Sequence, residues 1–369
     1  MANKLRYPSA INAGTGKLVT ADDSSLDVNS FARMQVLLNK SVNAGSLASS
    51  GVVSTYSLVY TAAAAYVGGV LAPNGDIHFV PVVANRGQKI SSSGVVSTYS
   101  LVYTASGAYV GGVLAPNGDI HFIPLNVIGQ KISSSGVVST YSLVYTAADA
   151  YIGGVLAPNG DIHFIPCSAA RGQKISSSGV VSTYSLVYTA ANAYEGGVLA
   201  PNGDIHFVPR SGNCGQKISS SGVVSTYSLV YTTSDAYNGG VLVPNGDIHF
   251  VPGSANRGQK ISAAGIVSTY SLIYTNSSGA YAGGVLAPNG DIHFIKNSAD
   301  RGQKISSSGV VSTYSLIYTA SGSYAGGVLT PNGDIHFISY TANCGQKIST
   351  NPAIPFSQAV CMSPFFNKF

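Results

Sequence analysis

Short runs of apolar and β-branched residues recur along most of the chain, separated by segments that contain Gly, Pro, Asn and Ser. None of these runs approaches the roughly 20 consecutive apolar residues that a membrane-spanning helix needs. Short runs enriched in Val, Ile, Tyr and Thr and bounded by turn residues are typical of β-strands. The pattern therefore predicts an all-β protein without a membrane span.

The runs belong to one repeated unit. The tetrapeptide Pro-Asn-Gly-Asp occurs seven times, at intervals of 42 to 44 residues. Its copies begin at Pro73, Pro116, Pro158, Pro201, Pro244, Pro288 and Pro331. Repetition at a fixed period of this size indicates a repeat architecture in which each unit packs on its neighbours.

Each unit predicts four short strands, which we name A to D. In the first unit they span residues 68–72, 76–81, 88–92 and 95–104. Pro-Asn-Gly between A and B suits a type I turn followed by a left-handed Gly, and a Ser-Ser-Gly turn joins C to D. Four strands in about 43 residues match one blade of a β-propeller. Gly-Gly at the start of strand A suits the innermost strand, where the blades converge.

The ends of the repeat region predict how the ring closes. The first repeated element, residues 51–61, is a D strand, and the last, residues 345–349, is a C strand. One blade must therefore combine an N-terminal D strand with C-terminal A, B and C strands. The expected fold is an all-β, seven-bladed propeller of four-stranded blades over residues 51–350.

Residues 68–79, Gly-Gly-Val-Leu-Ala-Pro-Asn-Gly-Asp-Ile-His-Phe, resemble kelch-like and WD40-like propeller repeats with a GGVLAPNG core, which occur in viral and bacterial proteins. The resemblance covers residues 51 to about 350. The chain has no Trp, so it departs from both the kelch and the WD40 patterns. The resemblance implies the fold and carries no particular function.

The segments outside the repeats form two further parts. Residues 1–50 are expected to be an N-terminal arm with a short amphipathic helix over about residues 25–40. Residues 351–369 are expected to be an extended apolar tail. The candidate anchoring residues in these parts are Phe31, Leu38, Phe356, Phe365, Phe366 and Phe369. They could dock on the propeller itself or attach it to another molecule.

Charge excludes one class of partner. Only 9% of the residues are charged, and the net charge of +5 is spread along the chain without a run of Lys or Arg. Nucleic acid is therefore not an expected partner. The N-terminus has no apolar segment of the kind found in signal peptides, so the chain is expected to be made in the host cytoplasm and to leave it, as part of a virion, by another route.

The repeated polar residues favour structural roles. Each of the seven His residues follows an Asp by two positions, as His78 follows Asp76. One His and one Asp per blade make an incomplete metal site, and identical groups around an axis do not form a nucleophile with its base. Four Cys residues show neither metal-binding nor disulfide spacing. We expect no metal, no cofactor and no enzymatic activity.

The copies differ mainly in the loops from B to C and from D to A. Because strands alternate in direction, both loops must emerge on one face of the ring, while the uniform turns occupy the other. The candidate partner-binding residues on the variable face are Asp149, Asn192, Glu195, Arg210, Asp235, Asn238, Lys296 and Tyr340. The alternative is relaxed constraint on longer loops.

One Tyr near the start of each strand A could instead stack on sugars. These candidate glycan-stacking residues are Tyr66, Tyr109, Tyr151, Tyr194, Tyr237, Tyr281 and Tyr324. The alternative is that they belong to the core between blades.

Non-repeating arms around a closed, weakly charged β scaffold resemble the build of structural proteins of phages and other viruses. The leading hypothesis is therefore a virion component that is anchored by its termini and binds other virion proteins or a host-surface target. The alternative is a glycan-binding, lectin-type propeller.

Overall fold

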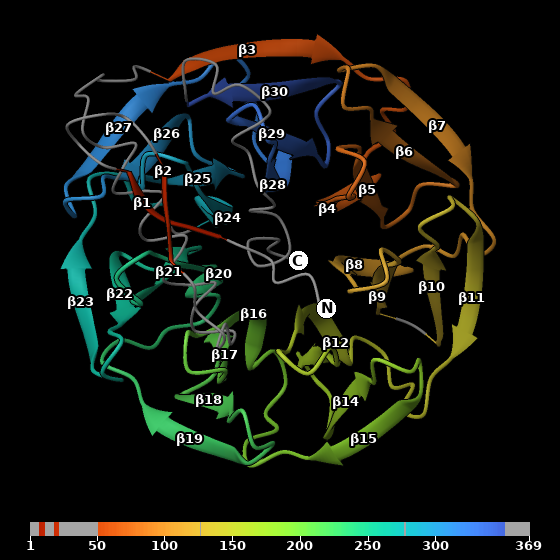
Figure 1. Cartoon of the computed structure of the whole chain (residues 1–369). Coiled ribbons are helices and arrows are strands. Elements are labelled where there is room, and N and C mark those ends of the chain that lie inside the picture. Colours follow the sequence, from red (N-terminus) through yellow and green to blue (C-terminus); the bar gives the residue numbers. More distant parts are fainter. Residues whose placement is uncertain (1–6, 12–17, 22–50, 126, 277, 351–369) are drawn as a thin grey trace. The chain divides into compact units, whose positions relative to one another are not determined.

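Figure 1 shows the computed structural model, which describes residues 7–11, 18–21, 51–125, 127–276 and 278–350. The expected helix over 25–40, the tail 351–369 and all six candidate anchoring residues lie outside the described residues. The chain divides into two compact units, Met1–Ala48 and Ser49–Phe369. In the first unit, β1 (Tyr7–Ile11) and β2 (Leu18–Ala21) pair as an antiparallel hairpin, which the sequence analysis did not predict.

The second unit contains seven antiparallel sheets of four strands each, and the predicted fold class is confirmed. In Figure 1 the A strands lie nearest the centre of the ring and the D strands form its rim. The A strands are β4 (Tyr66–Leu71), β8 (Tyr109–Leu114), β12 (Tyr151–Leu156), β16 (Tyr194–Leu199), β20 (Tyr237–Leu242), β24 (Tyr281–Leu286) and β28 (Tyr324–Leu329). The B strands are β5 (Ile77–Pro81), β9 (Ile120–Pro124), β13 (Ile162–Pro166), β17 (Ile205–Pro209), β21 (Ile248–Pro252), β25 (Ile292–Lys296) and β29 (Asp334–Ser339).

The outer two strands of each blade follow the same order. The C strands are β6 (Arg86–Ile90), β10 (Ile128–Ile132), β14 (Arg171–Ile175), β18 (Cys214–Ile218), β22 (Arg257–Ile261), β26 (Arg301–Ile305) and β30 (Cys344–Ser349). The D strands are β3 (Val52–Ser57), β7 (Val96–Ser100), β11 (Val138–Ser142), β15 (Val181–Ser185), β19 (Val224–Ser228), β23 (Val267–Ser271) and β27 (Val311–Ser315). We number the blades 1 to 7 from β4 to β28.

Blade 7 closes the ring as predicted. Its strand order is β28-β29-β30-β3, so the first D strand pairs with the last C strand, with Val52 opposite Ser349. On the inner side of this blade, Val328 and Ile338 pack against Tyr66 and Phe79 of blade 1. The same seam occurs between every pair of neighbouring blades. Each blade is therefore covered on both faces, which explains the weak alternation of polar and apolar residues in its strands.

Buried polar groups join the blades and their turns. The amide oxygen of Gln88, a fully buried residue of β6, accepts hydrogen bonds from the backbone N–H groups of Val59 and Tyr60, at 3.1 and 2.8 Å. These two residues follow β3 of blade 7, so the Gln side chain bridges two blades. An unsatisfied buried amide is costly, and this contact exists only when the neighbouring blade is in place.

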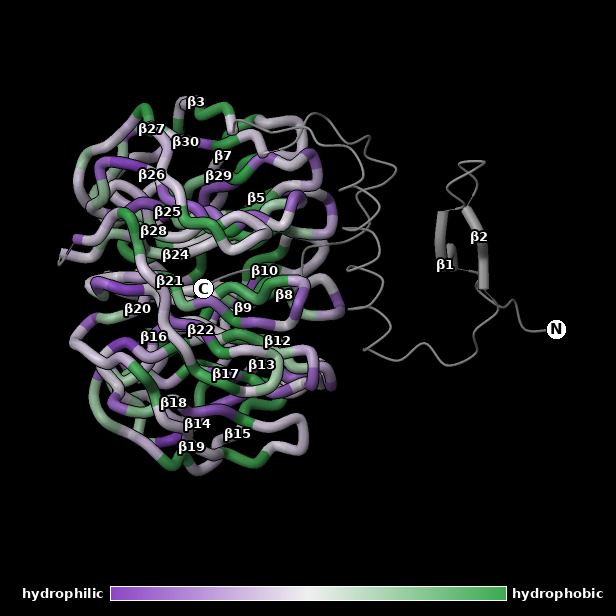
Figure 2. The backbone as a smooth tube through the Cα atoms, turned by 90° about the vertical axis from the view of Figure 1, so that its left-hand side faces the viewer, coloured by the Kyte–Doolittle hydropathy of each residue, from purple (hydrophilic) through white to green (hydrophobic). Residues whose placement is uncertain are grey.

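Asp76 ties two turns together at one end of the blade. Its carboxylate accepts hydrogen bonds from the Lys89 ammonium at 2.7 Å and from the Ser92 backbone N–H at 3.1 Å, while its own N–H donates to the side chain of Asn74. The A–B and C–D turns therefore lie together, and we call the end of the ring that they form the turn face. The opposite end, formed by the B–C and D–A loops, is called the loop face. Figure 2 shows the ring from its side, with the strands running between these two ends.

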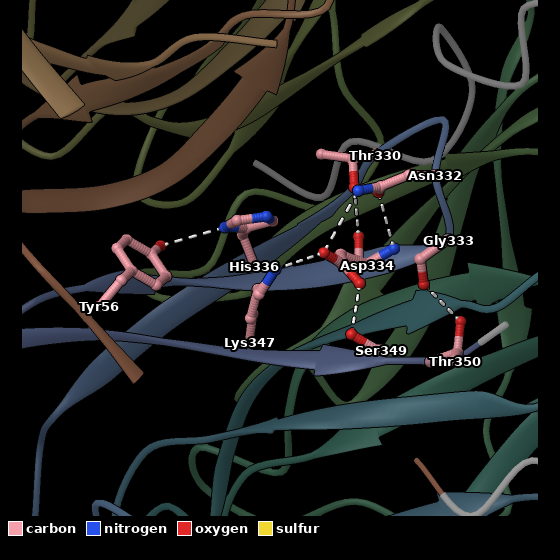
Figure 3. A network of polar contacts seen from close by, with 9 residues as sticks. All are labelled: Tyr56, Thr330, Asn332, Gly333, Asp334, His336, Lys347, Ser349 and Thr350. Carbon is pink, nitrogen blue, oxygen red and sulfur yellow. Dashed lines mark hydrogen bonds and ion pairs between the residues drawn. The ribbon is translucent and has the colours of Figure 1, made fainter. Parts of the chain in front are cut away.

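Blade 7 has no C–D turn, because the chain leaves β30 instead of continuing into β3. Hydroxyl groups replace the missing contacts (Figure 3). Ser349 donates to Asp334 at 2.5 Å, and the Thr350 hydroxyl and N–H both donate to the Gly333 carbonyl. Thr330, at a position that is Ala72 in blade 1, donates to the Asp334 carbonyl at 2.8 Å. These bonds hold the A–B turn of blade 7 in place, although this blade has no C–D turn beside it.

The seven His residues are structural. In blade 1, His78 lies 3.3 Å from the Tyr99 hydroxyl, and in blade 7 His336 lies 3.2 Å from Tyr56 (Figure 3). Burial, with a contribution from the adjacent Lys, lowers the pKa of each His to about 4. The imidazole rings are therefore neutral at neutral pH.

These pKa values predict acid sensitivity. Because the unfolded chain binds protons on its His residues below about pH 6.5 and the folded chain only near pH 4, the free energy of unfolding should fall steadily between these values. Urea titrations at a series of pH values measure the slope. A His78→Gln variant should reduce the slope by about one of the seven His contributions. A stability that does not change between pH 7 and pH 5 would contradict the assignment.

A second prediction concerns the left-handed residue that precedes each strand A. Ala64 has φ +56° where blades 2, 6 and 7 have Gly107, Gly279 and Gly322. A side chain in this region of backbone space is strained, so Ala64→Gly should raise the free energy of unfolding by roughly 0.5–1 kcal/mol. The reciprocal Gly107→Ala, which meets no atom within 4 Å, should lower it. Equal effects of both variants on the urea midpoint would argue against backbone strain.

Candidate functional site

Backbone hydrogen bonds join neighbouring loops over most of the loop face. In blade 1, the Val82 N–H of the B–C loop donates to the Ala65 carbonyl of the D–A loop at 2.9 Å. The Ala108 N–H of the next D–A loop donates to the Val82 carbonyl at 3.0 Å. The B–C loops of blades 1 and 3 to 7 are thereby joined to the D–A loops on both sides. The predicted placement of both variable loops at one end of the ring matches this geometry, and side chains on them are held by a rigid backbone.

Three of the candidate residues occupy a position with a backbone requirement. Asp149, Asn192 and Asp235 have φ values of +50°, +54° and +52°, at the position held by Ala64 in blade 1 and by Gly in blades 2, 6 and 7. Asp and Asn tolerate this conformation better than most residues. Their presence is therefore explained by local geometry, and only additional contacts indicate a role beyond it.

Asp235 has such contacts. Its carboxylate lies 2.6 Å from Nε of Arg210, which also lies 3.4 Å from the Glu195 carboxylate. Glu195 is the second residue of β16, Arg210 follows β17, and Asp235 precedes β20, so the group spans blades 4 and 5. Burial lowers the pKa of the Arg210 guanidinium, but Glu195 and Asp235 raise it by more. Two carboxylates around one guanidinium leave this charged cluster with a net charge of −1.

An apolar group adjoins the charged cluster. Val110, Ile152 and Cys167 pack together with Val67 and Leu125, all at the loop-face ends of blades 1 to 3. Burial raises the pKa of the Cys167 thiol, which also interacts electrostatically with Arg210 and Glu195. The two groups are therefore neighbours. The sequence analysis missed the apolar group, although the signal was present in blade-to-blade variation at the positions of Val67 and Val82.

The remaining candidates are less available to a partner. Lys296 ends strand β25 and is completely buried, and its ammonium donates to the Ala320 carbonyl and the Ser323 hydroxyl. Burial lowers its pKa to about 8. It stands where blades 1 to 5 have Pro81 or its equivalents, so its expected contact with a partner is corrected to a contact within the core. Asn238 donates to the Tyr281 carbonyl of the next blade, and Tyr340 is partly exposed.

The glycan-stacking hypothesis is also corrected by burial. Each of the seven candidate Tyr residues is at most 1% exposed. Tyr66 packs edge-on against Phe79 and donates its hydroxyl to the Arg86 carbonyl at 2.9 Å. Gly69 in strand A leaves space for the Val328 and Ile338 side chains of the neighbouring blade, which close the seam beside the ring. These residues belong to the core and offer no surface for a sugar.

The residues that the structure describes contain no group of three or more His, Cys, Asp or Glu side chains suited to a metal ion. Within the same residues, no helix has the length and apolar character needed to cross a bilayer.

Comparisons with known proteins identify the fold. No family model and no curated protein matches the chain. Among solved structures, streptogramin B lyase superposes with a TM-score of 0.69 at 20% identity, covering 82% of this chain and 98% of the lyase. A catalytically inactive virginiamycin B lyase from Staphylococcus aureus with quinupristin has a TM-score of 0.72 at 18% identity, covering 81% and 99%. YCF48 bound to D1 peptide has a TM-score of 0.62 at 14% identity, covering 81% and 95%.

These similarities overturn one expectation. Seven near-identical units were expected to preclude an enzyme, yet the lyases place catalysis on a propeller of this fold. The argument failed because residues that break the repeat, such as Glu195 and Arg210, can converge even when the repeated ones cannot. The identities establish the fold alone.

The charged cluster predicts a coupled effect on stability. Arg210→Met should lower the free energy of unfolding by about 1–2 kcal/mol, because it removes the guanidinium that offsets the charge of the largely buried Glu195 carboxylate. Adding Glu195→Gln should recover most of the loss. Chemical denaturation of both single variants and the double variant gives the coupling energy. Additive losses would show that the two side chains do not interact.

Proposed function

We propose that this protein is an interaction protein that displays its loop face to an asymmetric partner while its terminal segments attach it to a larger assembly. The supporting observation is that the blade-specific side chains and the ends of the described propeller lie at opposite ends of the ring. Blade-specific charged and apolar side chains gather on the loop face, whereas the described propeller begins at Gly51 and ends at Thr350 beside the turn face. An anchor attached there leaves the loop face free.

The separation follows from strand direction. Val52 pairs with Ser349 at the end of blade 7 where the other blades carry their C–D turns. The chain therefore enters and leaves the propeller at neighbouring points on the turn face. The turn face itself is uniform, because a Lys–Asp pair such as Lys89–Asp76 repeats in every blade and cancels its charge.

The partner's contact surface should complement the charged cluster and the adjacent apolar group. The Asp235 side chain is 50% exposed, so part of the net negative charge of the cluster faces the solvent. A cationic or hydrogen-bond-donating group beside an apolar side chain fits this arrangement. We propose a virus particle as the assembly and another virion protein or a host-surface molecule as the partner, supported by the closed, weakly charged scaffold between two non-repeating terminal segments.

Cysteine labelling of the assembled particle tests this arrangement. Ala191→Cys places a thiol on the exposed loop face, and Ala264→Cys places one on the exposed turn face. With the unsubstituted chain as background, a maleimide reagent should label position 191 at least about tenfold faster than position 264 in purified particles. The isolated chain should label at both positions at similar rates.

Binding of the target should then protect position 191. Host cells or their surface extract, added before the reagent, should slow labelling of Ala191→Cys without changing that of Ala264→Cys. Absence of the chain from purified particles, or preferential labelling of the turn face, would refute the proposal.

A further inference from the structure

The strand that closes the ring has one chain connection fewer than the other D strands. In blades 1 to 6 a tight turn joins strand C to strand D, as residues 91–94 join β6 to β7. In blade 7 strand C is β30, at the end of the repeats, and strand D is β3, at their start, so these two strands are joined by pairing alone. Figure 1 shows them side by side, coloured from opposite ends of the sequence. Within the described residues, β3 is therefore tied to the propeller only by the residues that follow it.

The contacts of β3 continue to residue 60, and we call residues 51–60 the closing segment. Its backbone pairs with β30 in continuous register. The Tyr56 hydroxyl lies 3.2 Å from the His336 ring, and the Tyr56 ring covers Gly345 so closely that a Cβ atom there would collide with it. The last two backbone N–H groups of the segment donate to the buried Gln88 amide oxygen. An identical segment from a second copy of the chain would find the same partners.

The remaining three strands of blade 7 are held by contacts that do not involve the closing segment. Ser349 donates to the Asp334 carboxylate, and Thr350 donates twice to the Gly333 carbonyl, which fixes the end of β30 on the A–B turn (Figure 3). On the inner side, strands A and B of blade 7 pack on blade 1. Strand β30 therefore offers an edge that accepts a D strand whichever chain supplies it.

A short, strained connection follows the closing segment. Residues 61–64, Thr-Ala-Ala-Ala, lead towards strand β4, and Ala64 has φ +56°. At this position the other six blades have Gly, Asp or Asn, which tolerate the left-handed region better than Ala does. The residue least suited to this conformation thus lies beside the one D strand that has no C–D turn. A short hinge under strain favours exchange of the adjoining element between copies.

We propose that two copies of this chain exchange their closing segments and so form a dimer. Each segment pairs with β30 of the other copy in its present register, and residues 61–64 extend from one ring to the other. The exchange keeps every contact of the closing segment and releases Ala64 from its strained conformation in both chains.

Two conditions follow from this geometry. Because association opposes the gain, the dimer forms at high protein concentration and only after the closing segment has left its own blade. Blade 7 alone exchanges in this way, because the chain holds every other D strand at both ends. The exchange does not depend on the function proposed above, since it involves only the closing segment, its hinge and blade 7.

A disulfide across the closing pair reports which chain supplies β3. Ser57 lies directly opposite Cys344 of β30. Residues opposite one another in antiparallel strands are within the Cα separation that a disulfide bridges. Ser57→Cys therefore links positions 57 and 344 within one chain in the monomer and between two chains in the exchanged dimer. The background carries Cys214→Ser and Cys361→Ser, and Cys167 is buried.

The test opens the ring and lets it close again. The variant is partly unfolded in urea, refolded over a range of protein concentrations, separated by size-exclusion chromatography and then oxidised. A dimer fraction should appear and rise with concentration, and on a non-reducing gel it should run at twice the chain mass of 37.7 kDa. The monomer fraction should run as a single chain. Oxidising the monomer before the urea step should abolish the dimer, because the disulfide holds β3 on its own β30.

A pair of Gly variants tests the hinge. Ala64→Gly removes the strain that exchange relieves in both chains, so the dissociation constant of the dimer should rise at least about fivefold. The matched control is Asp149→Gly, at the same backbone position before blade 3, where a C–D turn ties β11 to β10. This control should dimerise like the unsubstituted chain. Circular dichroism establishes that both variants are folded.

Three results would overturn the proposal. The first is a refolded chain that stays monomeric at every concentration. The second is a dimer whose oxidised chains run singly on the gel, because each β3 would then still pair with its own β30. The third is an equal dissociation constant for Ala64→Gly and Asp149→Gly, which would remove the hinge from the exchange.

Discussion

Closure of the ring is the constraint on which the rest of this structure depends. Each blade has two apolar faces, and both are buried only when a neighbour stands on each side. Pairing of β3 with β30 supplies the last seam, and Val328 and Ile338 are buried against Tyr66 and Phe79 as a result. The buried Gln88 amide imposes the same condition on polar groups, since its two donors come from the neighbouring blade. Burial of the apolar blade faces and hydrogen bonding of the Gln88 amide oxygen therefore both require the closed ring.

Because the unit is repeated, all blades share the same sheet and nearly the same turns, and they differ mainly on the loop face. The Asp–Lys pairs, the neutral His rings and the buried Tyr rings recur in every blade because each blade has the same turns and the same packing within its own sheet. Deviations are tolerated where loops leave the sheets. There the Arg210, Glu195 and Asp235 side chains meet beside an apolar group from blades 1 to 3. Streptogramin B lyase shows that a propeller of this fold can also support catalysis.

Much of the fold could be predicted because its signals are local and repeated seven times. Pro-Asn-Gly marks a turn, the period marks a blade, and the order of the first and last strands marks the closing partner. The site was less predictable. Asp149 and Asn192 were taken for binding residues, but their positive φ values explain them without a partner. Lys296 was expected at the surface, but it occupies a Pro position inside the sheet and turns its ammonium inward.

The sequence by itself determined the number of blades, their four-stranded composition, the closing pair and the end of the ring on which the copies differ. Only the tertiary structure decided which of the differing side chains meet and which are buried. Strand patterns depend on neighbours along the chain, whereas Arg210 and Asp235 are 25 residues apart and are joined by the approach of two blades. The apolar group around Cys167 arises in the same way, from side chains of three blades that meet only when the blades pack together.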